Sequence, residues 1–425
     1  MIVNIHNNGI IPPMKSFIDY YEFVSKNKKE IFDKLGYYYH FGKGDINRNV
    51  IKHDEYFFSP IIKSCLNNNV GYCDPAGRKS TRSIIALYES INRGIKYLSY
   101  KNISLSFGAT NAIFGALRSL LSICGNKKNI IVLTPCYTYI EAIEDLGFKI
   151  KLISTNNKEE SIKEIKKHIK KDCAAIFVSQ PSFPEGKEID KEIFNIIKTL
   201  SKENGVYIFI DEAYADVVIN KRNNQEYYDE NTVILRSLSK EWGVPGLRCG
   251  YVIGPEFMID EIRRKNEYVF GCPIVLFEIL VDLIMFVKIC EIKEECSDVS
   301  DIYKLGIEFD QKQRRILDDI DINEFAKSCK DFKNRLSNVI NEGLIISMEC
   351  LESVDELSLI IPEYGFNAVV KNNTEYTYRD IFQNTGVVLT PGELFNIPGH
   401  FRFSFADSPE NILEAWKRVI NYVKT

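Results

Sequence analysis

Short, nearly continuous apolar runs alternate with amphipathic segments through the middle of the chain. The runs are rich in valine and isoleucine, and an unbroken apolar run is typical of a strand that is buried on both faces. The segments between them repeat apolar residues at helical spacing, and one ends at Gly205, a residue type that commonly terminates helices. The pattern predicts strands at 129–135, 174–181, 206–214, 232–237 and 247–254, and helices at 139–148 and 191–205.

This alternation of strands and helices predicts an α/β fold, because parallel strands joined by helices form a sheet that helices cover on both faces. We expect a large domain with a mostly parallel sheet at 53–300. A smaller α+β domain at 301–425 would also include the N-terminal segment 1–52.

The pattern after Gly254 is helical up to about Asp319, and 300–320 reads as one long exposed helix. The C-terminal part combines apolar strand patterns at 357–371 and 399–406 with a last helix at 408–423. These elements define the smaller unit.

Composition and charge exclude several classes of function. The 425 residues carry a formal net charge of −4, with no cluster of Lys and Arg interleaved with aromatic residues, so no nucleic-acid partner is expected. The most apolar segment, 272–290, contains Glu278, Asp282 and Lys288, which predicts a buried or interface helix and no membrane partner.

The N-terminus lacks the pattern of a secretory signal, and the 11 cysteines form no CxxC pair, so we expect a cytoplasmic protein with free thiols. The five histidines show no metal-ligand spacing, and no metal site is expected.

Polar residues follow several of the predicted strands, and open α/β sheets bind ligands outside the carboxyl ends of their strands. Asp211 and Tyr214 follow one strand, and Ser237 and Lys240 follow the next. Glu212 directly follows Asp211 and would point to the opposite face of the sheet, so we interpret it as structural.

These residues together fit one cofactor. A helix N-terminus preceded by Gly108, Ala109 and Thr110 offers backbone N–H groups and a hydroxyl to a phosphate. Ser237 and Arg248 add a second hydroxyl and a fixed positive charge. The side chain of Tyr137 could stack on a flat ring.

Three further groups match the reactive end of that cofactor. Asp211 could pair with a protonated ring nitrogen, Tyr214 could donate to a ring oxygen, and Lys240 could form a Schiff base with an aldehyde. The implied cofactor is pyridoxal 5′-phosphate.

The order of four motifs is similar to that of a known family. They are GATNAI, TPCYTY, DEAYAD and SLSKEWGVPGLRCG, which begin at Gly108, Thr134, Asp211 and Ser237. From about residue 37 to residue 406 the chain resembles fold-type I pyridoxal-phosphate enzymes of the class I/II aminotransferase family, which belongs to the aspartate aminotransferase superfamily. The resemblance implies a large domain of the seven-stranded type with a smaller α+β domain, and a function in amino acid metabolism.

The resemblance also implies roles for individual residues. Lys240 would carry the cofactor and move the proton, Asp211 would hold the pyridinium, and Tyr214 would tune the phenolate. Arg402, in GHFRFSFA, would bind the substrate α-carboxylate, with Gly44, or its close competitor Gly42, beside it.

A homodimer is implied as well. Tyr72, in VGYCDPAG, matches a tyrosine that family members contribute to the phosphate site of the neighbouring subunit.

One position departs from the family pattern. The asparagine that usually donates to the phenolic oxygen of the cofactor falls at Phe183, which cannot donate. Three interpretations stay open. The turn is displaced by a residue or two, so that Gln180 or Ser182 reaches in; the enzyme is an ordinary transaminase with a weaker contact; or the change accompanies different chemistry.

The main hypothesis is an aminotransferase that acts on an α-amino acid and a 2-oxo acid. The alternative is a lyase, decarboxylase, oxidase or cyclase of the same fold, without net transamination. A non-catalytic regulator that binds the cofactor has less support, because Lys240 is retained. Aromatic residues such as Phe183 and Tyr137 weakly favour a neutral or apolar substrate side chain.

Overall fold

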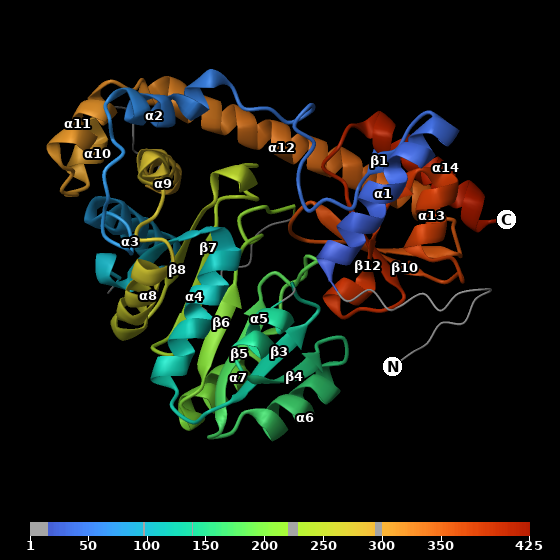
Figure 1. Ribbon diagram of the computed structural model, residues 1–425, viewed down its shortest axis with the longest axis horizontal. Helices are drawn as coiled ribbons and strands as arrows, with labels where there is room; N and C mark the ends of the chain where they lie inside the picture. The colour runs from blue at the N-terminus through green and yellow to red at the C-terminus, as the bar shows by residue number, and fades with distance from the viewer. Residues whose placement is uncertain (1–15, 97, 138, 220–227, 294–299) are drawn as a thin grey trace.

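The structure is a computed structural model that describes residues 16–96, 98–137, 139–219, 228–293 and 300–425 (Figure 1). Its centre is a seven-stranded sheet with the strand order β2-β8-β7-β6-β5-β3-β4. Only β8 runs antiparallel to its neighbours, so the sheet is mostly parallel, as predicted. The strands are β2 (Ile103–Phe107), β3 (Asn129–Thr134), β4 (Lys149–Ser154), β5 (Cys173–Ser179), β6 (Tyr207–Asp211), β7 (Thr232–Ser237) and β8 (Cys249–Ile253).

All five strands predicted for this sheet are confirmed, and the two strands of the sheet that the pattern did not indicate are β2 and β4. Both lie at the edges of the sheet. The pattern of β4 is ambiguous because its residues are mostly half-buried or exposed, with a lysine at every second position up to Lys151. Edge strands depend on packing on one side only, and their sequences carry a weaker signal.

Helices cover both faces of the sheet. One face packs against α4, α5 and α8 in a cluster of buried apolar residues, and the other face packs against a larger core that includes α3, α7 and α9. The helices of this unit are α2 (Glu55–Leu66), α3 (Lys79–Arg93), α4 (Gly108–Ile123), α5 (Ile140–Asp145), α6 (Lys158–His168), α7 (Lys191–Asn204), α8 (Glu256–Val269) and α9 (Glu278–Lys293), with 3-10 turns at Tyr100–Asn102, Pro245–Leu247 and Val275–Phe277.

The apolar segment at 272–290 contributes most of α9, whose residues from Glu278 to Ile289 are all buried. This confirms the predicted buried helix. Within the described residues, no helix has both the length and the apolar character that crossing a membrane requires.

A second, smaller unit contains a four-stranded antiparallel sheet with the order β12-β13-β10-β9. The long helix α12 runs across the top of the molecule from the region of α2 to this unit (Figure 1). The elements of the smaller unit are β9 (Leu357–Ile360), β10 (Asn367–Asn372), β11 (Val387–Val388), β12 (Thr390–Pro391), β13 (His400–Ser404), α12 (Ile322–Leu351), α13 (Tyr378–Thr385), α14 (Pro409–Val423) and a 3-10 turn at Gly392–Phe395.

The N-terminal segment joins this smaller unit. Strand β1 (Tyr39–His40) pairs with β11, and α1 (Phe17–Leu35) packs against α13. This pairing supports the assignment of 1–52 to the smaller domain; the boundaries at 52/53 and 300/301 stay a prediction.

The prediction of one long helix at 300–320 is wrong. The structure has two short helices, α10 (Ser300–Lys304) and α11 (Gln311–Asp318). Gly306 adopts a left-handed backbone conformation with φ of 73°, and the Asp310 side chain caps the first turn of α11. A helix cannot pass through either feature, because each one satisfies the backbone groups that a helix end leaves free.

The prediction that the cysteines are free thiols holds for nine of them and is wrong for Cys290, which is disulfide-bonded.

The close approach of α12 to α14 and to the residue that follows β13 gives a prediction on stability. A Cβ on Gly343 would overlap the carbonyl oxygen of Phe405 and lie 2.7 Å from Ile412 Cδ1. Helix propensity alone would make Gly343→Ala stabilising by about 1 kcal/mol. We expect instead a destabilisation of about 1–3 kcal/mol in urea unfolding, because the overlap forces the helix away from its neighbours.

The matched control is Asn338→Ala, on the exposed face of the same helix, which should be neutral or stabilising. A Gly343→Ala variant as stable as the wild type would contradict the close packing.

Candidate active site

Lys240 lies where segments from both units meet. It follows β7, and its amine donates a hydrogen bond to the carbonyl oxygen of Gly44, in the N-terminal segment. The Nζ atom also lies 5.3 Å from the ring centre of Tyr214, which comes from the turn after β6. The fold therefore brings together three segments that are far apart in the sequence.

The surroundings of Lys240 favour its uncharged form. Burial lowers the pKa of this lysine to about 8, with smaller contributions in the same direction from Arg402 and Arg248, while Asp45 opposes the shift. A lysine with a lowered pKa has more of the neutral amine near physiological pH, and the neutral amine is the form that attacks carbonyl carbons.

Asp211 ends β6 as a buried carboxylate. It accepts hydrogen bonds from the hydroxyl of Tyr139 and from the backbone N–H of Ala213, at 3.0 Å in the second case. Burial raises the pKa of Asp211, and the bond from Tyr139 opposes that effect. Tyr139 is thus the aromatic partner of Asp211; the sequence motif TPCYTY contained this residue, but only the fold shows its contact.

Phe183 lies at the site and stacks on Tyr214, with the ring centres 4.9 Å apart and the planes at 23°. The two side chains that could have replaced it are engaged in their own turn. Gln180 accepts from the N–H of Ile189 at 2.9 Å, and Ser182 accepts from the N–H of Lys187 at 3.2 Å. Among Gln180, Ser182 and Phe183, the apolar ring of Phe183 is therefore the side chain that lies next to the phenol.

The first turn of α4 meets β8 at very close range. A Cβ on Gly250 would lie 2.8 Å from the Cα of Gly108, so only glycine allows this approach. Gly108 itself has φ of 74°, a conformation that favours glycine. No side chain caps this helix start, at which Ala109 and Thr110 are the second and third residues.

Arg248 lies beside the same helix start. Its guanidinium donates to the carbonyl oxygens of Phe107 and Pro245, both at 2.9 Å, and it stays exposed. The hydroxyl oxygen of Ser237, at the end of β7, accepts a hydrogen bond from the N–H of Ser239 at 3.1 Å. In this bond the hydroxyl is the acceptor, so its proton can be donated to a ligand. A helix N-terminus and a guanidinium together form an anion site.

Arg402 projects from β13 toward the N-terminal segment and is only 3% exposed. It donates to the carbonyl oxygen of Gly42 and to the hydroxyl of Thr390, the latter at 2.8 Å. A Cβ on Gly44 would lie 3.2 Å from Arg402 Nη1 and 3.8 Å from Lys240 Nζ. Both glycines therefore border this guanidinium, Gly42 through its carbonyl and Gly44 through its missing side chain.

Four aromatic rings form a cluster beside Arg402. We call Phe17, Tyr137, Phe183 and Phe395 the aromatic cluster. Its ring centres lie 5.4–6.1 Å apart in adjacent pairs, and Arg402 lies 5.3 Å from the ring centre of Phe395. Phe17 and Phe395 belong to the smaller unit, and no sequence motif indicated them.

Tyr72 is the predicted site residue that stands apart. Its side chain is 94% exposed, and its ring lies 4.0 Å from the place of a Cβ on Gly271.

Glu212 belongs to a buried ion network behind the site, which agrees with its structural interpretation. It pairs with Arg93 at 2.5 Å and with Arg236 at 3.0 Å. Arg236 also pairs with Asp216. Lys288 forms two ion pairs, with Asp216 at 2.7 Å and with Glu241 at 2.8 Å. Because Glu241 directly follows Lys240, this network fixes the backbone that carries the lysine.

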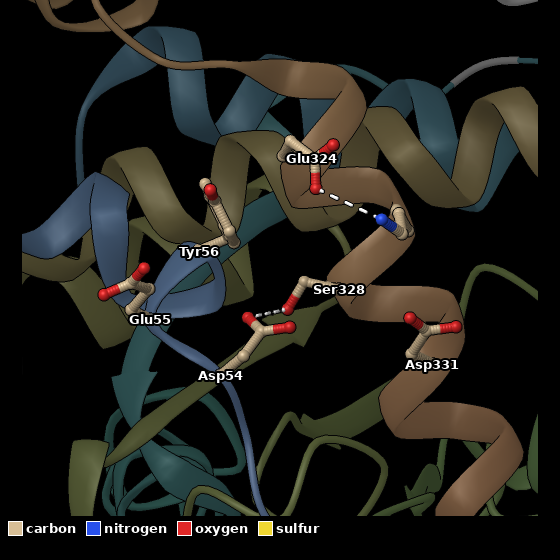
Figure 2. A pocket seen from close by; sticks show the side chains of 7 residues that line it. Asp54, Glu55, Tyr56, Glu324, Ser328 and Asp331 are labelled. Carbon is tan, nitrogen blue, oxygen red and sulfur yellow. Dashed lines mark hydrogen bonds and ion pairs between the residues drawn. The ribbon is translucent and has the colours of Figure 1, made fainter.

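A surface pocket at the other end of α12 contains none of the predicted site residues. Figure 2 shows it between the start of α2 and the first turns of α12. The Ser328 hydroxyl donates a hydrogen bond to the Asp54 carboxylate there at 2.5 Å. Asp54 also caps α2, and Lys327 pairs with Glu324 at 3.5 Å. Helix capping and surface pairing account for these groups.

Comparison with known proteins identifies the family. The model of the family described as aminotransferase class I and II matches residues 66–419. The (5-formylfuran-3-yl)methyl phosphate transaminase of Methanocaldococcus jannaschii is 26% identical over 375 residues, which cover 85% of this chain and 86% of that protein. The aspartate aminotransferase of Pyrococcus horikoshii is 24% identical over 363 residues, 82% of each chain.

Solved structures share the fold. A double mutant of Thermus thermophilus aspartate aminotransferase superposes with a TM-score of 0.76 at 18% identity, over 96% of this chain and 97% of that one. An alanine aminotransferase from Pyrococcus furiosus gives 0.75 at 19% identity, over 94% and 96%. The chain belongs to the class I and II aminotransferase family of fold-type I enzymes and is an enzyme of that class; the family depends on pyridoxal phosphate.

The residues present fit that cofactor. The cradle at Gly108 and Arg248 suits its phosphate, the buried carboxylate of Asp211 suits a ring nitrogen, and Lys240 suits an aldehyde. Within the described residues, no group of three or more His, Cys, Asp or Glu is placed to hold a metal ion.

The lowered pKa of Lys240 can be measured directly in cofactor-free protein. We expect labelling of its amine by acetic anhydride, followed by mass spectrometry, to rise with pH with a midpoint near 8. A free lysine in a model peptide in the same mixture should have a midpoint near about 10.4.

Two variants serve as controls with opposite signs. Asp45→Asn removes a nearby anion and should lower the midpoint, whereas Arg402→Gln removes a nearby cation and should raise it. A wild-type midpoint equal to that of the peptide would refute the proposed effect of burial.

Proposed function

We propose that this enzyme binds pyridoxal 5′-phosphate and transfers the amino group of an α-amino acid with an apolar or aromatic side chain to a 2-oxo acid. The observation that carries the proposal is the convergence of the Lys240 amine, the Asp211 carboxylate and the Arg402 guanidinium on one site from three segments. When bound, pyridoxal phosphate supplies an aldehyde for the amino group and a ring that withdraws electrons.

The residues of the chain would supply binding and proton transfer. Arg248, Ser237 and the start of α4 with Ala109 and Thr110 would hold the phosphate. Asp211 would hold the proton of the ring nitrogen, and Tyr139 would keep that carboxylate in place. Tyr137 would lie against the ring.

Lys240 and Tyr214 would act at the reacting atoms. The Lys240 amine would take the proton from the substrate α-carbon and return it to the carbon that joins the substrate to the cofactor. The Tyr214 hydroxyl would donate to the ring oxygen, and Phe183 would exclude water from this side of the phenol.

Arg402 supports the proposed substrate class. Part of its donor capacity is left over, because its Nε atom has no partner among the described residues. A substrate α-carboxylate would pair with the guanidinium on the side of Nη1, which faces Gly44 and has room for it.

The aromatic cluster would meet the substrate side chain, because it borders Arg402. Arg48, a second cation near Lys240, is already paired with Asp45 at 2.5 Å. An apolar side chain would gain contact with the rings, whereas a second carboxylate would lose its hydration and would have to compete with Asp45 for Arg48.

Phe183 favours a second candidate function. With no donor at this position, a lyase, decarboxylase, oxidase or cyclase reaction on the same amino acid would replace net transamination. We rank this candidate second because the relatives named above are aminotransferases.

We further propose a homodimer in which Tyr72 serves the phosphate site of the partner. Exposed apolar side chains at Ile62, Leu66 and Val70 precede it, and exposed apolar surface of this kind marks protein contacts. A cytoplasmic location and a role in amino acid biosynthesis are part of the proposal.

A single-turnover assay tests the reaction. Protein loaded with pyridoxal phosphate is mixed with phenylalanine, methionine or aspartate without any 2-oxo acid, and the products are identified by mass. We expect one equivalent of 2-oxo acid and of pyridoxamine phosphate, formed at least about tenfold faster from the apolar substrates than from aspartate.

Repeated turnover with the cofactor still as pyridoxal phosphate would favour the second candidate. A preference for aspartate would contradict the substrate class. Lys240→Ala, which lacks the amine, should give neither product.

Mixed dimers test the shared site. Lys240→Ala and Tyr72→Ala subunits, each weakly active alone, are refolded together. Random pairing makes half of the dimers mixed, each with one intact site, so about a quarter of wild-type activity should return.

In the control, the Lys240→Ala subunit is mixed with a Tyr268→Ala subunit in place of the Tyr72→Ala subunit. Tyr268 is also an exposed tyrosine. If Tyr72 served its own subunit, both sites of a mixed dimer would be defective and activity would stay at the level of the separate variants.

A further inference from the structure

The hydroxyl of Tyr214 has a neighbour that no sequence motif indicated. Asn367, the first residue of β10 in the smaller unit, donates a hydrogen bond from Nδ2 to this hydroxyl at 3.3 Å. The ring of Tyr214 lies between Phe183 at 4.9 Å and Phe366 at 5.5 Å. Asn367 is therefore a side-chain hydrogen-bond donor to a phenol whose ring contacts two other aromatic rings.

The backbone holds Asn367 firmly in place. Gly365, with φ of 83°, donates to the carbonyl oxygen of Val217 at 2.7 Å, and a Cβ on it would lie 3.2 Å from the Tyr214 ring. The N–H groups of Glu363 and Tyr364 donate to Gly186. This segment bridges the two units, so the position of the Asn367 amide relative to Tyr214 does not depend on a flexible loop.

The Asn367 side chain is 2% exposed, and its Oδ1 atom has no hydrogen-bond partner among the described residues. A buried amide with an unpaired oxygen costs stability, and an apolar residue of the same size would avoid that cost. Its retained contact is the bond to Tyr214. Stability alone thus does not explain an asparagine at this position.

The direction of the bond matters for the chemistry. A tyrosine hydroxyl has one proton to donate and can accept from another group. Because Asn367 donates, the Tyr214 proton stays available for the cofactor's ring oxygen. Hydrogen bonds in such a chain polarise one another, so the donor strength of the phenol increases.

We propose that Asn367 is a positioning residue that acts through Tyr214, directing the Tyr214 hydroxyl proton toward the ring oxygen of the cofactor and compensating for the donor that Phe183 cannot supply. The inference rests on the proposed function, because it requires bound pyridoxal phosphate. Asn367 itself need not touch the cofactor.

The test measures the apparent pKa of bound pyridoxal phosphate from its visible absorption across a pH series. A hydrogen bond to the deprotonated ring oxygen lowers this pKa, so weakening the bond raises it. We expect Asn367→Leu to raise the pKa by about 0.5–1 pH unit. Asn367→Asp should raise it by at least as much, because a carboxylate accepts the Tyr214 proton and turns it away from the ring.

A double variant separates action through Tyr214 from a general disturbance. Tyr214→Phe should raise the same pKa, and adding Asn367→Leu to it should cause no further shift, because the group through which Asn367 acts is already gone. Asn384→Leu is the matched control, since Asn384 donates to the Tyr422 hydroxyl at 3.1 Å on the surface; it should leave the absorption titration unchanged.

The outcomes distinguish the two proposals. Wild-type protein that takes up no pyridoxal phosphate and shows no visible band would overturn the proposed function and this inference with it. A normal band with unchanged titration in Asn367→Leu and Asn367→Asp, or additive shifts in the double variant, would overturn the inference alone. Circular dichroism checks folding, and if Asn367→Leu does not fold, the nearly isosteric Asn367→Asp decides the question.

Discussion

The site depends on holding the amine of Lys240 in a partly buried place, where its charged form is disfavoured. A cation removed from water loses hydration, and here its hydrogen-bond partner is the uncharged carbonyl of Gly44. Carboxylates are plentiful nearby, but those of Glu212, Asp216 and Glu241 are paired with Arg93, Arg236 and Lys288. Burial lowers the pKa of Lys240 to about 8, and Asp45 is the carboxylate that opposes this shift.

The same ion network holds the reactive groups in position. It connects α3, the turn after β6, β7 and α9, and Glu241 ties the residue next to Lys240 to this framework. Buried charge networks contribute little net stability when apolar packing could replace them, but removing one partner leaves an unpaired charge and is strongly unfavourable. The network therefore gives the loop after β7 a defined position and allows little adjustment.

Phe183 and Asn367 come from different units, and both contact the Tyr214 phenol. The turn after β5 places an apolar ring beside the Tyr214 phenol, while β10 of the smaller unit places an amide at its hydroxyl. The same smaller unit supplies Arg402 and, with α1, part of the aromatic cluster. The groups that we propose to select the substrate and to tune the phenol thus both depend on how the smaller unit packs on the large sheet.

The sequence by itself determined the elements with a continuous local signal. The five central strands, the buried helix α9 and the order of Asp211, Tyr214, Ser237, Lys240 and Arg248 follow from apolar runs and from motifs at strand ends. The tertiary structure decided what depends on contacts between distant segments. Two edge strands and the break near Gly306 had weak local patterns, and the contacts of Asn367, Phe17 and Tyr139 join residues 72 to 378 positions apart. Periodicity describes which face of an element is buried, but only packing selects which side chains meet across it.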